Sequence, residues 1–159
     1  MDELINKFES IARRINVQFS STSDAQSERQ HPFQERNIHS EIESVSLRLF
    51  DDGHYSQATF EAYKYIDKKV QSLSGLSSIG FSLMMDAFSE TSPKIKLTSL
   101  TNLSEIDEQK GYRFMFSGTV MAIRNPRGHE YGIKDSLDEC LDHLSLASML
   151  VRRLNNLIT

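Results

Sequence analysis

Three side chains suited to chemistry on a phosphate lie close together in the segment 124–129. It reads RNPRGH, so four residues separate Arg124 from His129, and Asn125 follows the arginine directly. A guanidinium is permanently charged and binds phosphate oxygens as a fork, whereas an imidazole exchanges protons near neutral pH. An amide can orient either group through its hydrogen bonds. The segment is therefore a candidate site for an anionic substrate.

A helix must carry this segment, and the proline within it predicts where that helix ends. Pro126 lacks an amide hydrogen and disfavours the helical conformation of the residue before it. We therefore expect a helix that begins at Ser104, with Asp107 completing a capping box, to end near Arg124. His129 would then lie on a rigid turn. The inner face that we expect for this helix consists of Ile106, Phe114, Phe116, Val120, Met121 and Ile123.

The surroundings of the segment distinguish it from a chance spacing, since Arg48 and His54 are separated similarly in an acidic context. Residues 110–134 contain five cations and one acid, Glu130, although the whole chain has a net charge of −4. Such an island can concentrate an anionic ligand, and the alternative is a charged helix surface without a ligand. The cations, which we expect to contact a substrate, are Lys110, Arg113, Arg124, Arg127 and Lys134.

The rest of the chain predicts an all-α, up-and-down bundle of about four or five helices. One helix from about Ile38 ends at a turn over 51–53, and a second follows over 55–73. A short helix at 81–88 precedes an extended segment, 93–97, which is either a strand or a strap. A last helix over 135–158 would be capped by Asp135, with Asp138 at the matching position. Gly111 and Gly118 allow a close helix approach, within the bundle or across a dimer.

The N-terminal segment, residues 1–37, forms an extension before a bundle domain at 38–159. Apolar residues at helical spacing predict a helix over 2–16, and the polar residues 18–31 predict a linker. Three roles stay open for this extension: a partner-binding helix, a dimer swap or an extra layer on the bundle.

The composition excludes several classes of protein. No run of about 18 apolar residues exists, so no membrane span is expected, and the acidic, amphipathic start is unlike a signal peptide. We therefore expect a cytoplasmic protein. The single cysteine, Cys140, has no disulfide partner and is predicted to pack in the core.

Two blocks of the sequence resemble the prophage-associated Ymh-type family of the HEPN superfamily (higher eukaryotes and prokaryotes nucleotide-binding). They read LFDDGHYSQATFEAYKYID at 49–67 and GYRFMFSGTVMAIRNPRGHE at 111–130, and the resemblance covers about residues 38–158. HEPN ribonucleases carry an arginine, four to six residues and a histidine at the end of a bundle helix. A polar residue typically follows the arginine. Arg124, Asn125 and His129 match this pattern.

The resemblance implies a homodimer in which two copies of the motif form one composite active site. It also implies a metal-independent endoribonuclease without a cofactor, often the toxic arm of a toxin–antitoxin or phage-defence system with an antitoxin or regulatory partner. RNA supplies its own nucleophile, the 2′-hydroxyl. His129 would serve as base or acid, Arg124 would stabilise the transition state, and Asn125 would orient the histidine or the phosphate. Arg127 would be a second phosphate contact, and the product would be a 2′,3′-cyclic phosphate.

Alternatives remain at this point. The domain could be a non-catalytic HEPN module that binds RNA or a nucleotide, a dimerising scaffold, or a sensor whose extension recruits a partner. Tyr131 matches an extended motif of HEPN toxins that are silenced by AMP transfer, or it is a rim or packing residue. A metal site is not expected, because no established ligand spacing joins His129, Glu130, Asp135 and His143.

Overall fold

A helical hairpin contains the central helix of the fold. The structure is a computed structural model that describes residues 30–158. In it α3 (Ser40–Asp51) is joined to α4 (Tyr55–Ser74) by the predicted turn. Gly53 has a φ of +76°, a left-handed conformation that glycine adopts without the penalty of a Cβ. The predictions for this hairpin are confirmed.

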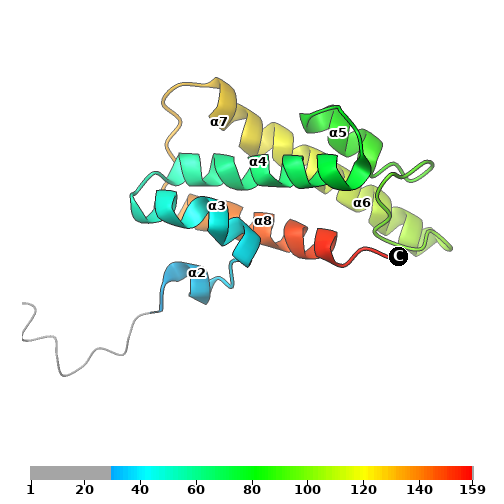
Figure 1. Cartoon of the computed structure of the whole chain (residues 1–159), viewed down its shortest axis with the longest axis horizontal. Helices are drawn as coiled ribbons and strands as arrows, with labels where there is room; N and C mark the ends of the chain where they lie inside the picture. Colours follow the sequence, from blue (N-terminus) through cyan, green and yellow to red (C-terminus); the bar gives the residue numbers. More distant parts are fainter. Residues whose placement is uncertain (1–29, 159) are drawn as a thin grey trace, which may run out of the picture. The chain divides into compact units, whose positions relative to one another are not determined.

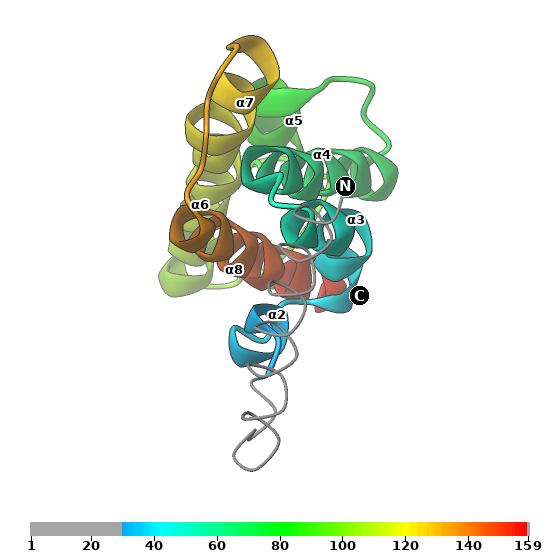
Figure 2. The same cartoon turned by 90° about the vertical axis from the view of Figure 1, so that its left-hand side faces the viewer.

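The remaining elements are also helical, which confirms the all-α prediction, and residues 30–158 contain no strand. α4 packs against α3, α5, α8 and the helical segment that contains the candidate site. Figure 2 looks along α4 and shows α3, α8, α6 and α5 placed around it. The further elements in Figure 1 are α2 (Pro32–Glu35), α5 (Gly80–Ala87), α6 (Leu103–Thr119), the π-helix η1 (Val120–Arg124), α7 (Asn125–His129) and α8 (Leu137–Asn155).

The C-terminal helix α8 begins at a different cap from the predicted one. Ser136 is the N-cap, and its side chain forms a reciprocal capping box with Glu139. Asp135, the predicted cap, lies one residue earlier and is an ion-pair partner instead. On the buried face of α8, Cys140 is fully buried and donates to the Tyr55 carbonyl, and burial raises the pKa of its thiol to about 11. The prediction of core packing for this cysteine is confirmed.

The extended segment 93–97 is a strap, so the structure decides between the two predicted forms. Ile95 and Leu97 insert into the core, with 2% and 0% of their surfaces exposed. The buried side chain of Gln109 on α6 satisfies the strap's backbone: it accepts from the Leu97 amide and donates to the Ile95 carbonyl. A side-chain amide thus replaces the neighbouring strand that this segment lacks.

The helix α6 begins earlier and presents a different face from the predicted one. Asn102 is its N-cap, accepting from the Glu105 amide, in place of the predicted Ser104. Phe114 and Met121, predicted to be inward, are 54% and 56% exposed. The prediction is wrong for these two because apolar residues occur on both sides of this helix, so periodicity alone could not select the buried side.

Most of the N-terminal extension lies outside the described residues. This applies to the helix predicted over 2–16 and to nearly all of the linker predicted over 18–31. The compact helical unit begins at Pro32, so α2, whose Phe33 is 3% exposed, belongs to the bundle. Within residues 30–158 no helix combines the length and the apolarity needed to cross a bilayer.

Candidate active site at the end of the α6–η1–α7 helix

The predicted break at Arg124 does not occur, because a π-helical turn accommodates the proline. Residues Val120–Arg124 form η1, in which the Asn125 amide bonds to the Val120 carbonyl five residues earlier. Asn125 keeps helical angles (φ −64°, ψ −45°), and Pro126 occupies the first turn of α7. The wider turn changes the backbone spacing where a proline ring would meet an α-helical carbonyl, so the helix continues to His129.

Arg124 is the last residue of this π turn. Its side chain is partly buried and has no carboxylate partner. Its Nη1 donates to the Asn125 side-chain oxygen at 3.1 Å, and its guanidinium carbon lies 5.7 Å from the centre of the Phe60 ring. Its Nε is buried without a hydrogen-bond partner. A buried donor without a partner carries a desolvation cost, which an acceptor that reached this nitrogen would relieve.

The other arginines among the described residues have a protein partner for their guanidinium group. Five of them pair with a carboxylate: Arg36, Arg48, Arg113, Arg127 and Arg153. Arg152 donates to the Asn37 carbonyl. Arg153 also has a buried Nε without a hydrogen-bond partner, but Arg153 is paired with Glu108. Among the described arginines, Arg124 therefore stands apart in combining such a nitrogen with the lack of a carboxylate partner.

Arg127 is turned into the protein and is not the open phosphate contact that the sequence predicted. Its Nη2 and Nε bind the two oxygens of Asp135 at 2.5 and 2.8 Å, and its Nη1 donates to the Ile123 carbonyl. The side chains of Arg127 and Asp135 are 10% and 3% exposed. A paired, buried guanidinium of this kind fixes α7 to the following loop.

Asp135 connects this loop to two further helices. Thr59 of α4 donates to its carboxylate, and its backbone amide donates to the Ser56 hydroxyl at 2.6 Å. His143 of α8 lies 3.7 Å from the same carboxylate. Burial favours a raised pKa for Asp135, but hydrogen bonds from Arg127 and Thr59 outweigh it and hold that pKa below its usual range.

The remaining cations of the predicted island are dispersed. Arg113 pairs with Glu90 and donates to the Met85 carbonyl, so it fixes α5 to α6. Lys110 is exposed, but at 1.5 Å per residue it lies about 20 Å from Arg124 along the helix. Lys134 is exposed in the loop after α7. Lys134 therefore remains the predicted substrate contact nearest in sequence to His129, whereas Arg113 is already paired.

His129 ends α7 and is exposed, as are Glu130 and Tyr131 after it. Residues five apart on an α-helix are rotated by roughly 140° about its axis. Arg124 and His129 therefore point to different sides of α7, and within the described residues no hydrogen bond joins them. Tyr131 is fully exposed, which leaves its hydroxyl accessible and excludes the packing role that the sequence left open.

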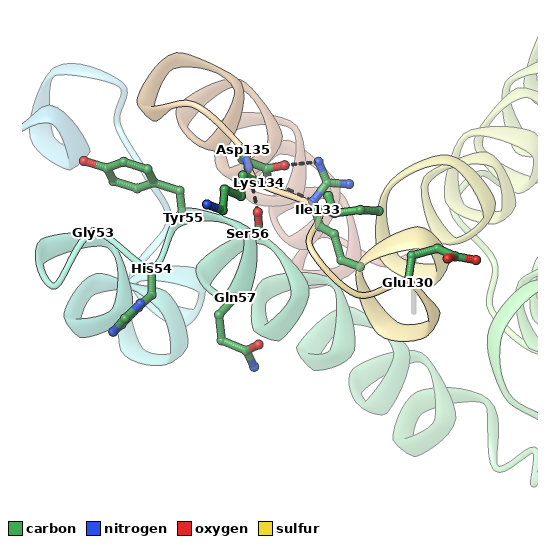
Figure 3. Close-up of a pocket in the computed structure, with 10 residues that line it drawn as sticks. Gly53, His54, Tyr55, Ser56, Gln57, Glu130, Ile133, Lys134 and Asp135 are labelled. Carbon is green, nitrogen blue, oxygen red and sulfur yellow. Dashed lines mark hydrogen bonds and ion pairs between the residues drawn. The ribbon is translucent and has the colours of Figure 1, made fainter.

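A cleft of about 490 Å³ lies between the first turn of α4 and the loop that follows α7. Figure 3 shows Ser56 directed at Asp135 on its inner wall and Glu130 on the α7 side. The full lining is Gly53, His54, Tyr55, Ser56, Gln57, Arg127, Glu130, Ile133, Lys134 and Asp135. This wall is polar, and its buried Arg127 and Asp135 neutralise each other.

The four residues considered as metal ligands do not form one cluster. Asp135 and His143 are close, but the Asp135 carboxylate is already paired with Arg127. Nowhere in residues 30–158 do three His, Cys, Asp or Glu side chains gather as a metal site would require.

An apolar stripe on α6 and η1, immediately before the candidate site, is not covered by the rest of the described bundle. Its members recur every three or four residues and are all exposed: Gly111, Phe114, Met115, Gly118, Met121 and Ala122. A Cβ built at Gly111 or Gly118 would meet no atom within 4 Å. These two glycines therefore do not serve a close approach within the described bundle.

Comparison with known families finds one family whose model matches most of the chain. A family model described as "Protein of unknown function (Hypoth_ymh)" matches residues 36–154. The chain belongs to the Hypoth_ymh family. The match covers α3 to α8 and contains both sequence blocks, so the predicted Ymh-type relationship is confirmed. No curated protein and no solved structure matches this Hypoth_ymh chain.

Sequence reasoning missed two residues that support the site. Phe60 lies on the polar side of α4, between Gln57 and Lys64, and this isolated aromatic on a polar face was an available signal. Asp135 was recognised as an acid near a helix start, but its partner lies eight residues earlier in a turn of unpredicted shape.

Proposed function

We propose that this protein is a metal-independent endoribonuclease of the HEPN type that works as a homodimer, serving as a toxin or phage-defence effector. The observation that carries the proposal is Arg124, a partly buried guanidinium that has no carboxylate partner and a buried Nε without a hydrogen bond, five residues before an exposed histidine. A phosphate oxygen would supply the missing acceptor and the opposite charge.

In the proposed reaction the 2′-hydroxyl of the RNA loses its proton to His129, and its oxygen attacks the adjacent phosphorus. The P–O5′ bond breaks, a 2′,3′-cyclic phosphate forms, and the leaving 5′ oxygen takes a proton from the partner's His129. Arg124 stabilises the additional negative charge of the phosphorane-like transition state. Asn125, already bonded to Arg124, orients the guanidinium.

A second copy supplies what one chain lacks. Because Arg124 and His129 point to different sides of α7, a substrate held between two copies can meet an arginine of one and a histidine of the other. The apolar stripe offers a surface for that second copy beside the site. Antiparallel packing of two such stripes across a two-fold axis would bury the exposed phenylalanine and methionines.

The decisive experiment incubates labelled RNA with the purified protein in excess chelator. We expect the wild type to leave cyclic phosphate ends and Arg124→Ala to cleave roughly a hundredfold more slowly, as for loss of an oxyanion donor. Arg48→Ala is the matched control, because Arg48 is exposed and has only a long, 3.9 Å pair with Asp52. Equal cleavage by all three proteins would indicate a contaminant. Binding of RNA without cleavage would favour the non-catalytic module.

The stripe makes its own prediction about assembly. Phe114→Glu places a charge at the centre of the apolar surface, so we expect the dimer to dissociate while the bundle keeps its helical content. Sedimentation velocity at micromolar concentration would measure this. Lys68→Glu, which also places a charge on an exposed position but on α4, is the control. A wild type that is monomeric at these concentrations would contradict the composite site.

A further inference from the structure

One aromatic ring of α4 contacts both the arginine and the glycine of the candidate motif. The Phe60 ring centre lies 5.7 Å from the Arg124 guanidinium carbon, and a Cβ on Gly128 would lie 2.9 Å from the Phe60 Cε2. Residues 124 and 128 are four apart, so they share the face of α7 that is turned toward α4. Phe60 thus fills the notch at Gly128 and lies beneath Arg124.

The ring also explains how the unusual state of Arg124 is tolerated. A guanidinium near an aromatic ring is attracted by the negative charge of the ring face, which partly compensates a donor that lacks an acceptor. The Nη1 group of Arg124 donates to the Asn125 side-chain oxygen, whereas the Nη2 group makes no hydrogen bond within the described residues. Lys64 lies 5.9 Å from the same ring, but it is paired with Glu61.

We propose that Phe60 is a positioning residue for the active site: its ring sets the depth at which α7 docks on α4 and directs the Arg124 guanidinium at the phosphate. This inference rests on the proposed function. Gly128 is then required for space, since a Cβ there would lie 2.9 Å from the Phe60 Cε2 and would displace the ring. His129, the next residue, takes its position from the same contact.

The first test measures the position of Arg124 without using activity. The Nε–Hε resonance of Arg124, assigned with Arg124→Lys, should be shifted by the ring current of Phe60. We expect Phe60→Leu to abolish that shift and Phe60→Tyr to retain it, whereas Phe81→Leu, an exposed phenylalanine of α5, should leave it unchanged. An unshifted resonance in the wild type would overturn the proposal.

The second test uses cleavage to separate positioning from simple packing. We expect Phe60→Leu to lower kcat roughly tenfold with KM nearly unchanged, and Phe60→Tyr to restore it, because small misplacement of a catalytic group is costly. Wild-type kcat in a folded Phe60→Leu protein whose ring-current shift is lost would refute positioning. If the wild type cleaves no RNA, the proposed function fails, and the resonance alone decides whether the ring places Arg124.

A double-mutant cycle tests the contact at Gly128. Gly128→Ala should lower kcat because its Cβ displaces the ring, although alanine favours the helix. Adding Phe60→Leu removes the clash, so we expect the double variant to be no slower than either single variant. Losses that simply multiply would show that the ring and residue 128 act independently and would overturn the inference.

Discussion

Replacing His129 with alanine is expected to lower the rate of RNA cleavage by about a hundredfold to ten-thousandfold, the range found for removal of a general acid or base. If His129 acts as base in one copy and acid in the other, the wild-type rate should follow a bell-shaped pH profile. His129 is exposed at the end of α7, and its side chain makes no hydrogen bond within the described residues, so the substitution should not affect folding.

Two comparisons make this prediction sharp. The melting temperature of His129→Ala should equal that of the wild type, which separates lost chemistry from lost structure. The profile of Arg124→Ala should keep the wild-type shape at a lower level, since an arginine does not titrate in this range. Undiminished cleavage by His129→Ala would remove the histidine from the mechanism.

Replacing Asp135 with alanine is expected to lower the free energy of unfolding by about 3–5 kcal/mol, the cost of leaving one member of a buried ion pair alone. Asp135 is 3% exposed and its carboxylate is held by Arg127 and Thr59, so alanine would leave the buried Arg127 guanidinium without its partner. Chemical denaturation would measure the loss. Asp138→Ala, exposed in the first turn of α8, should cost less than about 1 kcal/mol.

The pH dependence of Asp135 has a definite sign. Its pKa is lowered in the folded state, so its contribution to stability is present above the pKa of the unfolded chain and is lost as pH falls through the folded value. The difference in stability between the wild type and Asp135→Asn should therefore be greatest near neutral pH and shrink under acidic conditions. A difference that grows on acidification would contradict the ion pair.

The bundle could be predicted from the sequence because helical periodicity and turn glycines act locally. The hairpin α3–α4 and the amphipathic α8 follow from residues within a few positions of each other. The end of α6 could not be predicted, since a proline usually terminates a helix and the π turn that tolerates it depends on packing against α4. The partners of the cations could not be predicted either. Whether Arg127 meets a substrate or Asp135 depends on the path of a loop, and charge counting contains no such information.

The exposed stripe on α6 shows another limit of reasoning from sequence. Phe114 and Met121 follow a helical period as well as the buried Phe116 and Val120 do. The pattern of one sequence does not distinguish a face that packs in the core from an apolar face that stays exposed. The sequence predicted that Arg124 and His129 lie near one helix end, and the structure has them there, whereas the contact of Arg124 with Phe60 became visible only in three dimensions.

The π turn at Val120–Arg124 also has a consequence for the length of this helix. A π turn accommodates one residue more than the α-helical turn it replaces, so it behaves as a single-residue insertion that changes the phase of everything after it. Deleting one residue there would rotate the downstream segment by about 100° and draw it back by about 1.5 Å. Gly128 would leave the Phe60 ring, and the histidine would face a new direction. The one extra residue in the π turn thus sets the direction in which the side chains of the motif point about the helix axis.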